Sequence, residues 1–295
     1  MEVCCLVPQS GEGWTLAGFL RNALRLSTTQ IRRLKAADAL LVNGTPVFSN
    51  YRLRAGDMVF LSMTEPAPVY PAETGLLCVL YEDDQLLAVS KPQGMLVHPT
   101  HSRFTGTLAN RAWRHIRDAG GDGCHAVNRL DRDTGGVVLF AKNAWACSRM
   151  ADGVTEKVYL AVACGEPAGE SGRIELPIKR ERPEDMRRVC APDGAPAVTE
   201  YTVLERRAGL SLLRLRLLTG RTHQIRVHLA ALGCPVLGDR LYGTAASMLR
   251  AAELDQTVQA LWCVRMAFRQ PLTGEGLVAE ACPNAKIFEF FGFRY

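Results

Sequence analysis

The residues of this chain that are best suited to chemistry gather in one polar loop, within CHAVNRLDRDTGGVVLFAKN at residues 124–143. Asp131 and Asp133 lie in that loop, directly before an apolar run that predicts a buried strand. Loops that a rigid strand holds in place often carry catalytic groups. On the residues alone, however, Asp-x-Asp-Thr-Gly-Gly is also good turn chemistry, so a structural role for both carboxylates is the simpler interpretation.

Several common catalytic and ligand-binding patterns are absent from the sequence. It has no P-loop, no G-x-G-x-x-G after a strand, no H-E-x-x-H and no G-x-S-x-G. His223 and His228 form the one helical histidine pair, and their spacing is wrong for two metal ligands on one helix face. The ten cysteines include no C-x-x-C pair. The sequence therefore predicts no metal site and a set of reduced thiols.

The elements that position the polar loop fall into two parts of the chain, separated by EPAPVYPAETG at residues 65–75. Three prolines and few apolar residues over that span indicate an extended linker. We therefore predict a small domain over residues 1–64 and a larger one over residues 76–295. A length of 295 residues suits two domains.

The first 64 residues predict two short helices and a small β unit. Apolar positions at helical spacing over residues 15–24 predict the first helix, and Ser27 or Thr28 is a good cap for the second. Asn-Gly within residues 40–47 predicts a tight hairpin turn, and MVFLS at residues 58–62 predicts a last strand. Such a module is marginally stable by itself.

The larger part mixes strands and helices. Strands are predicted at residues 76–91 (two strands joined by an acidic turn), 136–142, 157–165 and 212–219, and helices over residues 105–118, the dozen residues after 142, and 222–233. In the last helix Thr222 is the predicted cap and Gly233 marks the end. Because helices and strands do not alternate strictly, we predict an α+β fold with a mixed, largely antiparallel sheet.

Five ordered blocks of the larger part resemble one family. NRLDRDTGG at residues 128–136 resembles the H-R-L-D-x-x-T-S-G signature of the RluA family of RNA pseudouridine synthases. The other blocks are KPQGMLVHP (91–99), KVYLA (157–161), LTGRTHQIRVH (218–228) with GD and LYG (238–243), and a C-terminal block from Arg265 to Glu275. They follow the family order from about residue 76 to 283. Residues 1–64 resemble an S4-type RNA-binding domain in the helix pair, in VNG at 42–44 and in LRAGD at 53–57.

This resemblance implies an isomerisation of uridine in RNA without a cofactor, in which the glycosidic bond moves from N1 to C5 of the base. Asp131 matches the family's essential aspartate, and attack at C1′, addition at C6 and removal of a 2′ proton all stay open as its role. Arg221 matches the arginine that pairs with this aspartate. Tyr159 matches the tyrosine that stacks on the target base, which is flipped out of its helix, and that could take its C5 proton.

The resemblance also implies roles for residues outside the catalytic set. The predicted RNA-binding residues are Arg129 and Arg132 beside Asp131, and Arg21, Arg25, Arg32, Arg33 and Lys35 in the N-terminal part. The residues predicted to shape the site are Lys91, His98, Thr134, His223 and Gln224. The last two fall in the first turn of a helix whose dipole favours a nearby phosphate or Asp131.

The sequence departs from the family pattern at four places. Asn128 stands where His is usual, and Gly135 where Ser is usual. Trp262-Cys263 stands where L-H-A is common, and Gln270 where a His precedes the proline. These departures affect the geometry of the loop and the fit of the substrate more than the catalytic groups.

Two classes of function stay open, an active RNA uridine isomerase and a non-catalytic RNA-binding or ribosome-assembly protein. The carboxylate, tyrosine and arginine together favour the enzyme. A glycosidase that uses Asp131 and Asp133 fits poorly, because the two residues share one short turn. By analogy with S4-bearing relatives we expect large-subunit rRNA as the target, with tRNA as the alternative.

The charge of the chain agrees with an RNA partner but is weak support for one. The net charge is +5, and residues 1–64 carry seven basic residues against four acidic ones, although a solvated face is the commoner cause of such an excess. No apolar run of about 18 residues and no signal-peptide pattern occur, so we expect a cytoplasmic protein with no membrane and no DNA partner. We also expect a monomer.

Overall fold

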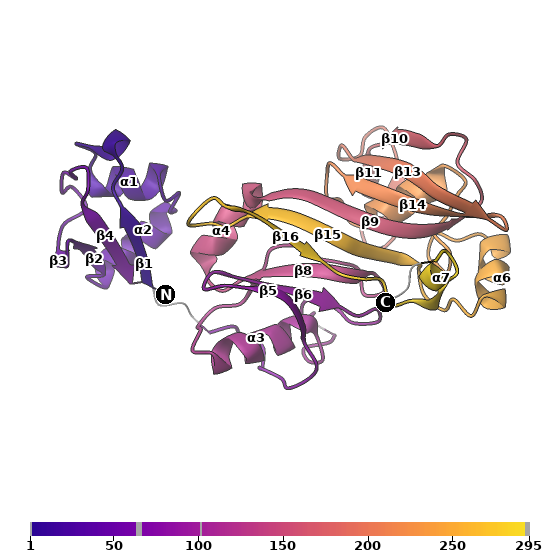
Figure 1. Ribbon diagram of the computed structural model, residues 1–295, viewed down its shortest axis with the longest axis horizontal. Coiled ribbons are helices and arrows are strands. Elements are labelled where there is room, and N and C mark those ends of the chain that lie inside the picture. The colour runs from indigo at the N-terminus through magenta and orange to yellow at the C-terminus, as the bar shows by residue number, and fades with distance from the viewer. Residues whose placement is uncertain (1, 63–66, 101, 293–295) are drawn as a thin grey trace.

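The structure is a computed structural model that describes residues 2–62, 67–100 and 102–292. The predicted linker and the predicted domain boundary at residue 64 lie partly outside the described residues, at 63–66. Figure 1 shows two separate bodies, which we call the N-terminal unit (residues 2–62) and the main unit (residues 67–292). No helix within the described ranges is both long and apolar enough to cross a membrane.

The N-terminal unit packs two helices on a four-stranded antiparallel sheet of strand order β1-β4-β2-β3. Its elements are β1 (Glu2–Leu6), the 3-10 turn η1 (Gln9–Gly11), α1 (Leu16–Asn22), α2 (Thr28–Ala36), β2 (Leu40–Val42), β3 (Thr45–Pro46) and β4 (Met58–Ser62). Thr15 caps α1, and Ser27 caps α2 in a capping box with Gln30. Both helices and the hairpin are confirmed, while β1 was not predicted.

The main unit is built on a ten-stranded sheet of order β10-β13-β14-β9-β15-β8-β6-β5, with β16 beside β15 and β7 beside β8. Its strands are β5 (Cys78–Glu82), β6 (Leu86–Lys91), β7 (His125–Ala126), β8 (Gly135–Ala141), β9 (Val154–Cys164), β10 (Ser171–Glu175), β13 (Val198–Arg207), β14 (Leu210–Leu217), β15 (Leu261–Arg269) and β16 (Gly276–Glu280). Only the pair β15·β8 of this sheet is parallel among the described strands. The predicted α+β class with a largely antiparallel sheet is therefore confirmed.

Five helices and one hairpin complete the main unit. They are α3 (Leu108–Asp118), α4 (Ala144–Gly153), α5 (Gln224–Ala231), α6 (Ala245–Glu253), α7 (Lys286–Glu289) and the hairpin of β11 (Ile178–Arg180) and β12 (Arg188–Cys190). In Figure 1, α3 lies under β5 and β6, and the hairpin lies near β13 and β14. Helix α5 ends before Gly233, whose φ of 73° allows the left-handed stop that its position predicted.

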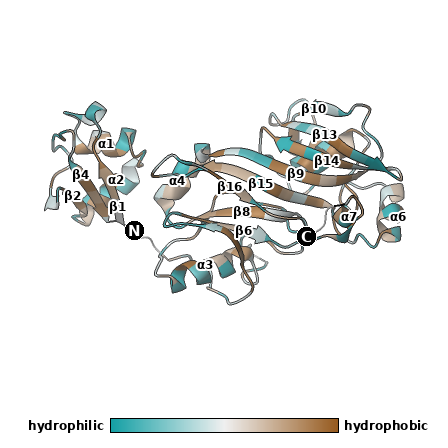
Figure 2. Cartoon of the chain, viewed as in Figure 1, coloured by the Kyte–Doolittle hydropathy of each residue, from teal (hydrophilic) through white to brown (hydrophobic). Residues whose placement is uncertain are grey.

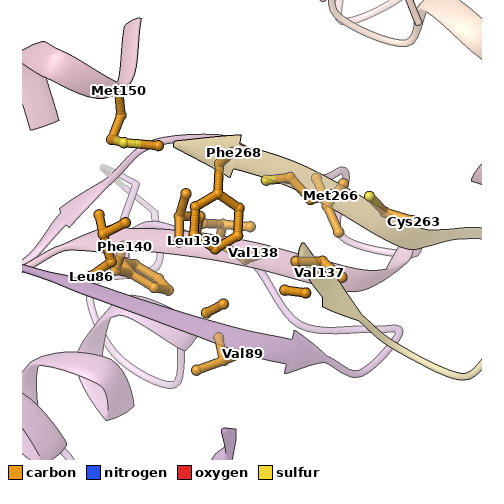
Figure 3. Close-up of a cluster of buried hydrophobic side chains, with 14 of the residues drawn as sticks. Leu86, Val89, Val137, Val138, Leu139, Phe140, Met150, Cys263, Met266 and Phe268 are labelled. Carbon is orange, nitrogen blue, oxygen red and sulfur yellow. The ribbon is translucent and has the colours of Figure 1, made fainter. Parts of the chain in front are cut away.

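The core of the main unit lies where β6, β8 and β15 meet. All seven residues of β8 are buried, because both faces of the strand are covered by other parts of the main unit. Figure 2 shows hydrophobic residues along β8 and β9, and Figure 3 shows the side chains that fill this region. Phe140, Phe268 and Met150 are each no more than 1% exposed there. This packed strand is the rigid support from which the polar loop at residues 127–134 projects.

Among the described residues, a hydrogen bond and an ion pair connect the N-terminal unit to α4 of the main unit. The indole Nε1 of Trp145, a residue that is 1% exposed, donates to the carbonyl of Leu24 at 2.8 Å. Arg25 forms an exposed ion pair with Asp152 at 3.0 Å. The described part of the predicted linker has no regular secondary structure, but Tyr70 is buried in it and donates to the carbonyl of Cys124 at 3.0 Å. These residues therefore pack on the main unit.

Candidate active site

Asp131 lies in the loop between β7 and β8, just before the first residue of the interior strand β8. The amide of Thr134 donates to the Asp131 carbonyl at 3.1 Å, which closes the turn that the sequence predicted. Thr134 is buried, and its hydroxyl accepts a hydrogen bond from Gln259 at 2.7 Å. The Asp131 side chain is 27% exposed. The turn thus holds the backbone and leaves the carboxylate partly open to solvent.

Lys91 is bonded to the backbone of the same loop. Its side chain is fully buried, and Nζ donates to the carbonyls of Pro92, Met95 and Arg132 at 2.8–3.0 Å. Burial lowers the pKa of Lys91 to about 7, against the opposing effect of Asp133 and Asp131. Three carbonyls use all three donors of an ammonium group, so the site is built for the charged form. Lys91 therefore shapes the site by tying the turn after β6 to the Asp131 loop.

Arg226 on α5 is the partner of the Asp131 carboxylate. Its Nη1 donates to Asp131 Oδ2 at 2.7 Å. Its Nε and Nη2 donate to the two carboxylate oxygens of Asp239 at 2.7 and 2.8 Å. Asp239 is fully buried and also accepts from the amides of Leu241 and Tyr242. The bidentate contact fixes the plane of the guanidinium and hence the direction from which it reaches Asp131.

The prediction that Arg221 pairs with Asp131 is wrong. Arg221 is exposed, lies before α5, and donates through Nε to the carbonyl of Pro196 at 3.0 Å. The predicted cap Thr222 is also wrong: α5 begins at Gln224 after His223, which has a φ of 59° and no side-chain capping bond. Arg226, the second arginine of GRTHQIR, lies on α5 within the predicted helix and meets the carboxylate instead. Both arginines lie in the motif, so the motif alone does not show which of them pairs with Asp131.

His223 lies near Asp131, as predicted, whereas Gln224 bonds to other residues of the loop before α5 and of β13. His223 Nε2 is 3.8 Å from Asp131 Oδ2, and its Nδ1 is 2.8 Å from the hydroxyl of Tyr242. Burial lowers the pKa of His223. The buried Gln224 accepts from Arg221 N and from the Thr219 hydroxyl. Gln224 therefore folds the loop before α5, whereas His223 faces the carboxylate.

Tyr159 lies on β9, and its side chain is almost entirely buried at 5% exposure of the residue. It is opposite Cys263 in the β9·β15 register, and its hydroxyl lies beside the Cys263 thiol. Burial raises the pKa of Tyr159 well above its ordinary value, with the Cys263 thiol and the Asp131 charge adding to the effect. The ring therefore lies near Asp131 as a neutral phenol.

The other predicted residues of the main unit have less direct relations to Asp131. Arg132 is exposed and forms a bidentate pair with Asp133 at 2.8 and 2.9 Å. Arg129 is exposed and has no hydrogen bond or ion pair to any residue that the structure describes. His98 is half-buried and stacks edge-on against Tyr70 at 5.6 Å. Arg129 is thus an exposed cation of the Asp131 loop, and its charge acts on His98.

The five basic residues of the N-terminal unit lie on the surface of α1, α2 and the turn between them. Arg21, Arg32, Arg33 and Lys35 are exposed. Arg25 is exposed too, but it pairs with Asp152 of the main unit. The structure therefore gathers these residues on one unit, separate from the Asp131 site.

Two of the departures from the family signature compensate each other. A Cβ on Gly135 would lie 2.2 Å from the Trp262 ring, because the two residues are opposite each other in the parallel pair β8·β15. The indole therefore fills the space that a serine at residue 135 needs. Asn128 stands where histidine is usual. Its Nδ2 donates to the carbonyl of Val137 at 3.2 Å, and its Oδ1 accepts from the amide of Leu139 at 2.8 Å. These changes preserve the loop.

The site combines the carboxylate of Asp131, the guanidinium of Arg226 that Asp239 holds in place, and the neutral aromatic ring of Tyr159. Arg226 holds Oδ2 of Asp131, whereas no donor among the described residues binds Oδ1. The described ranges also contain no group of three His, Cys, Asp or Glu side chains that could hold a metal ion. A carboxylate with one oxygen fixed and the other open can act as a nucleophile or as a proton acceptor.

Comparisons with known proteins agree with this site. Residues 85–231, which include the Asp131 loop, Tyr159 and Arg226, match the RNA pseudouridylate synthase family. The uncharacterized RNA pseudouridine synthase YhcT of Bacillus subtilis is 37% identical over 94% of this chain and 92% of its own length. The chain therefore belongs to the RNA pseudouridylate synthase family. It is an RNA-modifying isomerase that acts on uridine.

Two further relatives extend the comparison. Ribosomal large subunit pseudouridine synthase D of Xanthomonas campestris is 35% identical over 84% of this chain and 78% of the relative. The solved structure of human RNA pseudouridylate synthase domain containing 1 has a TM-score of 0.56 and 27% identity, and covers 72% of this chain and 86% of the human one. Both comparisons thus agree with the family that the fold and the site indicate.

The roles of the two arginines can be separated by conservative substitution. Arg226→Lys removes the fork that bridges two carboxylates, which an ammonium group cannot replace. We expect it to lower the free energy of unfolding by about 3 kcal/mol, because it leaves Asp239 buried with one partner fewer. Uridine isomerisation should fall by about 100-fold or more, as for the loss of a fixed electrostatic partner. Arg221→Lys is the matched control, and we expect a stability change within about 0.5 kcal/mol. Equal losses in both variants would contradict the assignment of Arg226.

The compensation between Gly135 and Trp262 can be measured by a double-mutant cycle. We expect Gly135→Ser alone to destabilise the protein by about 3 kcal/mol, because the new Cβ collides with the indole. Trp262→Leu should rescue part of that loss, so the double variant is more stable than the sum of the single changes. Gly136→Ala is the control, because its Cβ would meet the backbone of Cys263 at 2.1 Å, a collision that Trp262→Leu cannot relieve. Additive effects of Gly135→Ser and Trp262→Leu in thermal unfolding would refute the pairing.

Proposed function

We propose that this enzyme isomerises uridine in large-subunit rRNA, with Asp131 as the catalytic carboxylate and the N-terminal unit as an S4-like RNA-binding domain. The observation that carries the proposal is the Asp131–Arg226–Asp239 network, which presents one free carboxylate oxygen at a partly open loop. The bond from C1′ to N1 breaks, N1 gains a proton, the bond from C1′ to C5 forms, and C5 loses its proton. No redox step and no external group is needed.

Asp131 is suited to each of the first steps that the chemistry allows. Attack at C1′, addition at C6 and removal of the 2′ proton all require an unblocked carboxylate oxygen near the nucleotide. Oδ1 meets this requirement because Arg226 engages Oδ2. The same arginine stabilises the carboxylate when it is released after the new bond forms.

Tyr159 is suited to hold the base once it leaves the RNA stack. Base extrusion costs a few kcal/mol, which stacking against an aromatic ring offsets. The raised pKa of Tyr159 keeps the phenol neutral, and a neutral phenol stacks well but is a poor proton acceptor. We therefore assign Tyr159 to stacking and leave the C5 proton to another group. Arg129, exposed beside Asp131, is suited to fill the space that the base vacates.

The preference for large-subunit rRNA rests on two observations. The Xanthomonas campestris relative is named a ribosomal large subunit pseudouridine synthase. The N-terminal unit exposes Arg32, Arg33 and Lys35 on α2, as a domain that binds phosphates would. This target also implies that the protein acts in the cytoplasm. A tRNA target is the alternative that the experiment below distinguishes.

The catalytic assignment can be tested by mapping pseudouridine in the RNA of cells that carry Asp131→Asn. We expect the variant to lose the same modified sites as a strain without the protein, because an amide cannot act as nucleophile or base. Asp133→Asn is the matched control, since that carboxylate pairs with Arg132. Loss of modified sites from large-subunit rRNA supports the proposal. Loss of sites from tRNA alone would show that tRNA is the target instead, and an unchanged map would refute the catalytic role.

The role of the N-terminal unit can be tested by the salt dependence of RNA binding. We expect the triple change of Arg32, Arg33 and Lys35 to alanine to weaken binding to an unmodified large-subunit rRNA transcript. The slope of log Kd against log salt should fall by up to about 3, about one for each phosphate that the variant no longer neutralises. Arg250→Ala, which removes a cation of α6 paired with Glu253, is the control. An unaltered slope in the triple variant would show that α2 does not bind the RNA.

A further inference from the structure

His223 lies between the catalytic carboxylate and a buried tyrosine, in a backbone conformation that β-carbon-bearing residues rarely adopt. Its φ is 59°, and its side chain is 8% exposed. A left-handed residue other than glycine costs free energy, which the surrounding contacts must offset. Both ring nitrogens face polar groups: Nδ1 faces Tyr242 and Nε2 faces Asp131. The conformation thus places the imidazole ring between the two.

The directions of the hydrogen bonds around Tyr242 determine where the proton of His223 lies. The backbone N–H of Arg188, at the start of β12, donates to the Tyr242 hydroxyl oxygen at 2.8 Å. An N–H group can only donate, so the hydroxyl is the acceptor there and its own proton is left for a second neighbour. His223 Nδ1, at 2.8 Å, is the one other hydrogen-bonding partner of that hydroxyl among the described residues. If the hydroxyl accepted from His223 as well, its own proton would have no acceptor among the described residues, so we assign the hydroxyl as the donor to Nδ1.

This direction fixes the tautomer of the neutral ring. A neutral imidazole that accepts at Nδ1 carries its proton on Nε2. Nε2 faces Asp131 Oδ2 at 3.8 Å, the oxygen that Arg226 binds at 2.7 Å. We propose that His223 is a positioning residue whose Nε2–H, fixed by the Tyr242 hydroxyl, donates to Asp131 Oδ2 in the RNA complex. The proposal rests on the proposed catalytic role of Asp131.

The distance of 3.8 Å is longer than a hydrogen bond, and catalytic hydrogen bonds are often long before the substrate binds. A second donor on Oδ2 leaves Oδ1 as the oxygen that reacts. Two donors from different directions also stop the carboxylate from rotating about its Cβ–Cγ bond. His223 therefore adds an orientation that Arg226 alone does not give.

Burial and the nearby cations favour the neutral ring, the form whose orientation the Tyr242 hydroxyl fixes. Burial lowers the pKa of His223, and the cations of Arg226 and Arg188 lower it further. Asp131 and Asp239 oppose them by favouring the imidazolium. Tyr242 contributes its hydroxyl proton, which binds the neutral ring and not the imidazolium. On protonation Nδ1 becomes a donor and the bond from Tyr242 is lost.

The tautomer can be observed directly, without an activity assay, in the full chain labelled with ¹⁵N-histidine. Long-range ¹H–¹⁵N spectra distinguish a ring protonated at Nε2 from one protonated at Nδ1. We expect the Nε2–H form for His223 in the wild type. In Tyr242→Phe we expect a mixture of the two forms and a higher pKa for His223, because the donor that favours the neutral ring is gone. An Nδ1–H ring in the wild type, or identical spectra in the variant, would overturn the proposal.

The effect on catalysis is tested with a large-subunit rRNA transcript that carries tritium at C5 of its uridines, since isomerisation releases that atom to water. His223→Gln retains an amide N–H near the position of Nε2, whereas the amide of His223→Asn reaches the position of Nδ1 only. We expect kcat to fall by about tenfold in the Asn variant, about the effect of one hydrogen bond, and to be largely rescued in the Gln variant. KM should change little in either.

Thermal unfolding and the pH profile separate positioning from a structural role. Both variants should unfold at similar temperatures, so that a difference in kcat alone reports on Asp131. The fall in kcat at low pH that protonation of His223 causes should disappear in His223→Gln. In Tyr242→Phe it should occur at higher pH. Equal kcat values for the Gln and Asn variants would refute the role of Nε2. If the wild type releases no tritium from this transcript, the proposed target is wrong, while the spectra still decide the tautomer.

Discussion

The guanidinium of Arg226 is the group on which the site depends. It is 7% exposed and lies between two carboxylates, one fully buried and one partly open. Removing such a cation from water is costly, and the cost is offset only when every donor finds a partner of suitable geometry. Asp239 supplies two acceptors and is held by two backbone amides. The contact of Arg226 with Asp131 therefore depends on the turn after α5, which holds Asp239 in place.

The Asp131 loop is also fixed by two side chains that bind its backbone, those of Lys91 and Gln93. Lys91 binds the carbonyl of Arg132, and Gln93 binds the carbonyls of Asp133 and Gln259. Buried backbone carbonyls need donors, and a loop that leaves a sheet has no ladder to provide them. The family block at residues 91–99 thus supplies side chains in place of a strand. The two sets of contacts come from β6 and α5, far apart in the sequence, so the position of Asp131 depends on the whole sheet.

Much of this arrangement could be predicted from the sequence, and the errors have a common cause. Helices α1 and α2, the Asn-Gly hairpin and β14 follow from local spacing, capping and alternation, and they are present. Strand β1 was missed because its pairing with β4 involves residues more than fifty positions away. Arg221 was named from the resemblance to the family motif, which contains both arginines, and only the tertiary contacts show that Arg226 is the one that meets Asp131. The motif identified the chemistry, whereas side-chain direction depended on tertiary contacts.

The departures from the family signature show how a local pattern can change without a change in the site. Gly135 and Trp262 are two separate departures in the sequence, but they occupy one volume between β8 and β15. The exchange has a cost, since Trp262 Nε1 is the one buried side-chain nitrogen or oxygen in the described ranges without a hydrogen-bond partner. The indole has a large apolar surface that stabilises the junction of the two strands and offsets that cost. The space between β8 and β15 can therefore be filled from either strand, and the pair Gly135 and Trp262 fills it from β15 while Asp131 still faces Arg226.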